Sequence, residues 1–150
     1  MQLSGIEKWE SKYKPIRMEA VQRIRQFNPD ILMMQDFQNY DSDVLWSNIS
    51  LFRDTLGFAY YYFKSNYEEV RPWGTANEGV AIFSKIPIVD SGAVPYTGRK
   101  YPSNIAWVQV LFNKKPLRFA TTHFTSMNLN TKPLPTDSLN YYLLQDSTVL

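Results

Sequence analysis

Three short apolar runs, each carrying an acid or imidazole where its apolar pattern breaks, constrain this chain more than any other feature. The longest, residues 78–88, reads Glu-Gly-Val-Ala-Ile-Phe-Ser-Lys-Ile-Pro-Ile. An earlier run, residues 29–36, ends in an aspartate, and a later one, residues 117–124, contains the single histidine of the chain. Short apolar runs of this kind are typical of strands buried within a sheet. The chain is therefore expected to fold around a sheet that carries acids and an imidazole near its strand ends.

Helical spacing precedes the strand-like runs. Apolar residues at this spacing predict a helix over residues 16–27, with Pro15 in its first turn. A second helix is expected to have its N-cap within Asp41-Ser42-Asp43 and to end at Gly57.

Strand periodicity follows Gly57. The predicted strands are Phe58–Phe63, Gly79–Ser84, Val89–Pro95, Ala106–Phe112 and Arg118–Phe124. Lys114-Lys115 before Pro116 predicts a tight hairpin between the last two. This order favours an α/β (α+β) fold, a mixed sheet with helices packed on one side.

Composition excludes several classes of protein. With 150 residues, 44% hydrophobic and 20% charged, the chain has the composition of one globular domain. The absence of cysteine excludes disulfides and thiolate metal sites. No apolar run approaches the roughly 20 residues that cross a bilayer, and residues 1–14 lack a signal-peptide pattern, so a cytoplasmic or nuclear location is the default expectation. A net charge of +2 does not select a nucleic-acid partner.

Asp36, Glu78 and His123 are the candidate chemical groups. A carboxylate at the end of an apolar strand, as at Asp36, is a suitable ligand for Mg²⁺, although an acid there also caps loops. Glu78 precedes a strand, where its carboxylate could orient an imidazole on a neighbouring strand or stand exposed. His123 shares a strand face with Phe119 and Thr121, in a catalytic or a structural role.

The sequence lacks the residues that other classes of catalytic site require. The sequence has no Gly-x-Ser-x-Gly elbow, no set of His and Cys for zinc, and neither a P-loop nor a glycine-rich dinucleotide motif.

Taken together, the three runs resemble the first half of an endonuclease/exonuclease/phosphatase domain, the deoxyribonuclease-I-like fold, over residues 9–124. Gln35-Asp36 is similar to the family's Gln-Glu, whose glutamate holds Mg²⁺, with a shorter acid in its place. Residues 78–88 resemble the run whose acid orients a histidine, and Thr122-His123-Phe124 resembles the strand that carries it. The resemblance implies a four-layer α-β-β-α sandwich with mixed, largely antiparallel sheets.

The chain also departs from the family pattern. It has no Gly-Asp-Phe-Asn, no second histidine, and no asparagine-bearing first strand. Residues 1–150 are thus expected to form a partial domain of about half the family length, in which 125–150 form a loop and a short helix. One sheet is expected to dominate, and its inner face to remain exposed.

The resemblance implies a Mg²⁺-dependent (or Mn²⁺-dependent) phosphoester hydrolase, a nuclease or phosphatase acting by in-line attack of water. Asp36 would hold the metal, while His123 and Glu78 would be the catalytic pair. The substrate class would be a nucleic acid, a phosphoinositide or other phospholipid headgroup, or a nucleotide. The chain alone is expected to have little activity, and the alternative is a non-catalytic binding module derived from this fold.

Overall fold

The computed structural model describes residues 5–41, 47–72, 74–96 and 103–123. Two helices and six strands follow in the order α1 (Gly5–Phe27), β1 (Ile31–Tyr40), α2 (Asn48–Leu56), β2 (Tyr60–Arg71), β3 (Gly74–Ser84), β4 (Ile88–Tyr96), β5 (Ser103–Phe112) and β6 (Lys115–Thr122). The predictions for Ser42, Asp43, Phe124 and residues 125–150 lie outside the described residues.

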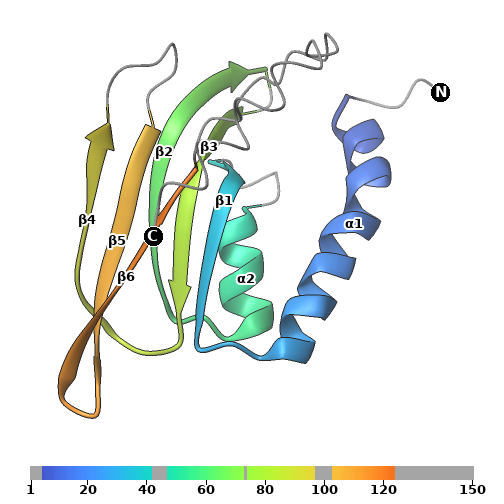
Figure 1. Cartoon of the computed structure of the whole chain (residues 1–150). Coiled ribbons are helices and arrows are strands. Elements are labelled where there is room, and N and C mark those ends of the chain that lie inside the picture. The colour runs from blue at the N-terminus through green and yellow to red at the C-terminus, as the bar shows by residue number, and fades with distance from the viewer. Residues whose placement is uncertain (1–4, 42–46, 73, 97–102, 124–150) are drawn as a thin grey trace, which may run out of the picture.

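The strands form two antiparallel sheets that pack face to face. One sheet has the order β1-β3-β2 and the other β4-β5-β6. Helices α1 and α2 lie on the outer side of the first sheet, and the second sheet lies on its other side (Figure 1). Three layers of the expected α-β-β-α sandwich are thus present in the described part of the chain.

The second sheet corrects the expectation of a single dominant sheet with an exposed inner face. Asn104, Ala106, Val108 and Val110 alternate along β5 as buried residues and face the first sheet. Strand β3 is accordingly covered on both faces, and every residue from Gly79 to Ser84 is buried.

The helix boundaries differ from the predictions at their N-termini. Helix α1 begins at Gly5 and continues through Pro15. Ile6, Trp9 and Tyr13 already carry the helical spacing upstream of the proline, a signal that would have extended the predicted helix. The N-cap of α2 is Ser47, whose side chain accepts a hydrogen bond from the Ser50 amide at 3.1 Å.

The predicted C-terminus of α2 and the predicted hairpin are both confirmed. Gly57 caps the helix with a φ of 73°, the left-handed conformation that glycine adopts without strain. Strands β5 and β6 form the hairpin, but its turn is Asn113-Lys114, both with positive φ, because Lys115 and Pro116 already belong to β6. Pro116 is tolerated because β6 is an edge strand among the described residues.

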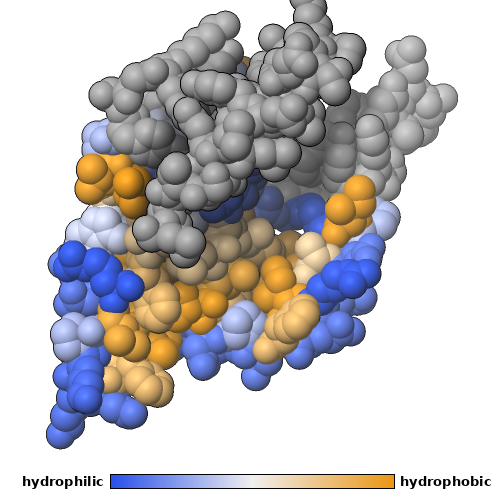
Figure 2. All heavy atoms as spheres, in the orientation of Figure 1, coloured by the Kyte–Doolittle hydropathy of each residue, from blue (hydrophilic) through white to orange (hydrophobic). Residues whose placement is uncertain are grey.

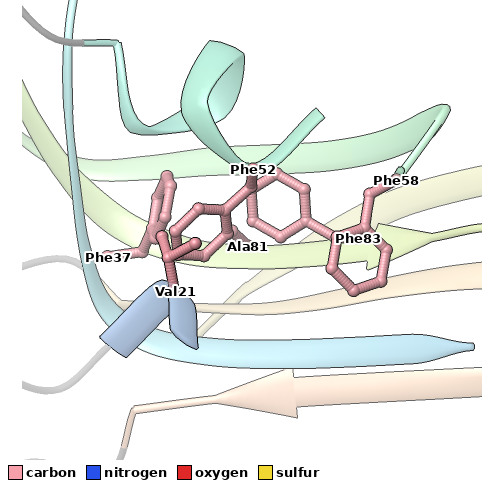
Figure 3. Close-up of a cluster of buried hydrophobic side chains, with 6 residues drawn as sticks. All are labelled: Val21, Phe37, Phe52, Phe58, Ala81 and Phe83. Atoms are coloured by element: carbon pink, nitrogen blue, oxygen red, sulfur yellow. The ribbon is translucent and has the colours of Figure 1, made fainter. Parts of the chain in front are cut away.

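Aromatic rings fill the core between the helices and the first sheet. Phe83 lies at its centre, with Phe37, Phe52 and Phe58 at ring-centroid distances of 5.2 to 5.8 Å. Val21 brings α1 into the same cluster (Figure 3). Off-parallel ring contacts at these distances add to the effect of burial, so this cluster fixes both helices on the sheet.

Apolar side chains also gather on the face where edge strands β1 and β6 lie (Figure 2). Met33 on β1 is 46% exposed and Leu117 on β6 is 42% exposed.

Neither of the described helices is long and apolar enough to cross a bilayer.

Candidate functional site

A β-bulge in β1 determines where the first candidate acid points. The pairing of β1 with β3 shifts between Met34 and Phe37, leaving Gln35 and Asp36 as the bulged residues. Asp36 has a φ of 50°, a left-handed conformation that aspartate tolerates better than most residues. Bulges re-aim side chains, and here the carboxylate points towards the second sheet.

His123 meets this carboxylate from the second sheet. Thr121 pairs with Ala106 of β5 on the inward face, and strand alternation places His123 on that same face, as predicted. His123 Nδ1 lies 2.6 Å from Asp36 Oδ1. The structure thus joins two candidate residues that the sequence separates widely.

The contact between Asp36 and His123 is open to solvent. Their side chains are 59% and 40% exposed, respectively. Exposed ion pairs contribute only about 0–1 kcal/mol to stability. Stability alone is therefore a weak explanation for a left-handed aspartate placed opposite a histidine.

Glu78 lies on the same face of the first sheet, one strand inward. Gln38 of β1 is its cross-strand partner, and Gln38 Nε2 donates a hydrogen bond to Glu78 Oε2 at 2.9 Å. Diagonal neighbours on one face of a sheet are about 7–8 Å apart, so Glu78 is near the Asp36 bulge. The predicted role of Glu78 in orienting His123 stays a prediction, because the hydrogen bond that the structure gives it is to Gln38.

Sequence reasoning missed several polar residues around this group. Asn104 of β5 is 6% exposed and donates to Asn66 Oδ1 at 2.7 Å, a bond that joins the two sheets. Gln38 was missed as well. In each case the available signal was a polar residue within a strand, because a buried polar group needs a hydrogen-bond partner. The sequence does not show which residue that partner is.

A buried polar network holds the adjoining end of β1. Asn39 and Asn77 are both buried and both donate to the Asp41 carboxylate, at 3.1 and 2.6 Å. Asn39 Oδ1 in turn accepts from Ser47 Oγ and the Ile49 amide at the start of α2, each at 3.1 Å. These bonds satisfy the buried amides and fix the strand end beside the bulge.

Two arginines lie at the same end of the molecule. Burial lowers the pKa of Arg17, and the nearby Tyr40 opposes that change. The hydrogen bond to Glu69, at 2.7 Å, raises the pKa of Arg71. Both guanidinium groups stay charged at neutral pH, because the pKa of an arginine side chain is ordinarily far above neutral.

The donor chemistry suits a hard cation held largely by water. Among the described residues, no three or more His, Cys, Asp or Glu side chains converge closely enough to hold a metal ion together. Mg²⁺ commonly binds proteins through one or two carboxylates and keeps several waters. The solvent-exposed carboxylate of Asp36 fits that mode, and a closed structural metal site is not formed by these residues.

A model of the Endonuclease/Exonuclease/phosphatase family matches residues 16–145. An endonuclease/exonuclease/phosphatase family protein from Leptotrichia buccalis is similar in structure, with a TM-score of 0.55 and 15% identity over 94% of this chain. An endonuclease/exonuclease/phosphatase from Beutenbergia cavernae gives a TM-score of 0.58 and 15% identity over 75% of this chain. No curated protein sequence matches the chain.

The chain spans 57% of the Leptotrichia structure and 33% of the Beutenbergia structure. At this identity the two structures show a shared fold. They confirm the expected two-sheet sandwich fold.

Proposed function

Because this chain belongs to the endonuclease/exonuclease/phosphatase family, we propose that it is part of a Mg²⁺-dependent phosphoester hydrolase that works by in-line attack of water. The observation that carries the proposal is the 2.6 Å contact between Asp36 and His123, with Glu78 on the same face. Two carboxylates and an imidazole at one end of a sandwich suit the binding of a phosphate and the movement of a proton.

Asp36 is the residue that would hold Mg²⁺. Its carboxylate is exposed, so the waters that complete the coordination of this ion have room around it. The bound cation would supply charge neutralisation of the phosphate oxygens.

His123 and Glu78 would act on the substrate and its surroundings. A ring whose Nδ1 faces a carboxylate has a defined orientation, which suits it to hydrogen-bond a phosphate oxygen. Glu78, held by Gln38, adds a second fixed carboxylate beside this position. Together they would orient the phosphoester for attack by water.

The experiment is a Mg²⁺ titration of the 150-residue chain by isothermal calorimetry, which does not require a complete catalytic site. We expect Asp36→Asn to abolish Mg²⁺ binding. Asp54→Asn is the control, because Asp54 is an exposed acid on α2. Equal Mg²⁺ binding by wild type and Asp36→Asn would contradict the proposed role of Asp36 as the metal ligand. The non-catalytic binding module would then be the better assignment.

A further inference from the structure

An exposed tyrosine adjoins the candidate site on β2. Tyr67 pairs directly with Glu78 of β3, and directly opposed residues point to the same face of a sheet. Gln38, Glu78 and Tyr67 therefore form one row across the three strands of the first sheet. The Tyr67 residue is 53% exposed, so its ring is accessible beside the Glu78 carboxylate.

A second β-bulge is what aims Tyr67 at this face. The pairing of β2 with β3 shifts between Ser65 and Tyr67, with Asn66 as the extra residue. Because side chains alternate along a strand, Tyr67 would point towards the helices without this insertion. The Ser65 hydroxyl donates to the Tyr67 carbonyl at 2.9 Å, and Asn104 holds Asn66, so the bulge is fixed from both sides.

Gly79 allows the bulge to approach β3. A Cβ at this position would lie 2.0 Å from the Lys64 carbonyl oxygen and 2.9 Å from the Ser65 Cα. Both neighbours are backbone atoms, which cannot rotate away. The bulges in β1 and β2 therefore flank one glycine in β3, and they aim Asp36 and Tyr67 at the same face.

Tyr60, at the other end of β2, is an exposed tyrosine that no bulge positions, so it can be compared with Tyr67. It pairs with Ser84 and is 38% exposed, in a part of the strand with regular register. An aromatic residue that a fixed bulge exposes beside Glu78, on the face towards which Asp36 points, differs from one exposed on a regular strand. Bulges are over-represented next to active sites because they re-aim side chains in this way.

We propose that Tyr67 is a substrate-contacting residue whose ring stacks on a planar, unsaturated ring carried by the phosphoester next to its phosphate. This inference rests on the proposed function, since it assumes that the phosphate lies at Asp36 and His123. Stacking of one ring on an aromatic side chain corresponds to about a 5- to 100-fold change in affinity when the side chain is removed.

The test is a binding titration followed by ³¹P NMR in MgCl₂ with two probes. Bis(4-nitrophenyl) phosphate carries planar rings, and diethyl phosphate does not. We expect Tyr67→Ala to weaken the aryl probe about 5- to 100-fold and to leave diethyl phosphate unchanged. Tyr67→Phe is expected to bind both probes as wild type does, and Tyr60→Ala is the matched control. Tyr67→Leu, which keeps apolar bulk without a ring, should behave as Tyr67→Ala and replaces it if that variant does not fold.

The outcomes separate this inference from the proposed function. Unchanged aryl binding in Tyr67→Ala, with both probes lost in Asp36→Asn, would overturn the role of Tyr67 alone. Aryl binding that depends on Tyr67 but survives Asp36→Asn would overturn the proposed function. A wild-type chain that binds neither probe would overturn both.

Discussion

The substitution Gly79→Ala tests the geometry on which the site depends. The added methyl group would lie 2.0 Å from the Lys64 carbonyl oxygen, whereas an ordinary carbon–oxygen contact is about 3.3 Å. Strands β2 and β3 must therefore separate by about 1.3 Å at the bulge. A displacement of that size takes neighbouring ladder bonds beyond hydrogen-bonding distance.

The expected loss in the free energy of unfolding follows from the backbone hydrogen bonds that break. Two ladder bonds contribute about 0.5–1.5 kcal/mol each, and an alanine recovers about 0.4–1 kcal/mol by restricting the unfolded chain. The expected net loss is about 1–2 kcal/mol, within the usual range for an overpacked interior. In a chain of this length 1 kcal/mol corresponds to about 2–4 °C in Tm, so a decrease of about 2–8 °C is expected.

Urea unfolding followed by circular dichroism measures this loss, and Gly92→Ala is the matched control. A Cβ at Gly92 would meet ring atoms of Trp107 at 2.8 to 3.0 Å, and a side chain moves more easily than backbone. We expect the control to lose less than about 1 kcal/mol. The reasoning fails if Gly79→Ala unfolds within about 0.5 kcal/mol of wild type, or if Gly92→Ala is the more damaging change.

Two further predictions concern the elements that support the site. Phe83→Ala should lower the free energy of unfolding by about 3–5 kcal/mol in a urea titration, because this ring is fully buried among aromatic neighbours. Phe27→Ala, at a ring that is 85% exposed, should stay within about 0.5 kcal/mol, and a similar loss in both would contradict the core described above. Ser47→Ala should cost about 0.5–2 kcal/mol by thermal unfolding, because it removes the N-cap of α2. Ser50→Ala, which keeps the capped amide, should cost clearly less, and equal losses would show that the cap is dispensable.

Local sequence patterns determined much of the fold and named the candidate residues. Gly57 ended α2 as predicted because its left-handed conformation suits glycine. The alternation along β6 placed His123 on the same face as Thr121, as predicted. All three apolar runs form strands, but among the described residues only the one around Ile82 is buried on both faces, and the other two form the edge strands β1 and β6. These features depend on short-range sterics and periodicity, which a sequence displays directly.

Only the tertiary structure decided which candidates meet. One inserted residue in β1 and one in β2 aim Asp36 and Tyr67 at the face of Glu78, and no periodic pattern reveals such insertions. The second sheet covers the inner face that was expected to remain exposed, and it brings His123 to Asp36. Site geometry here depends on strand register and sheet packing, because these set which distant residues become neighbours.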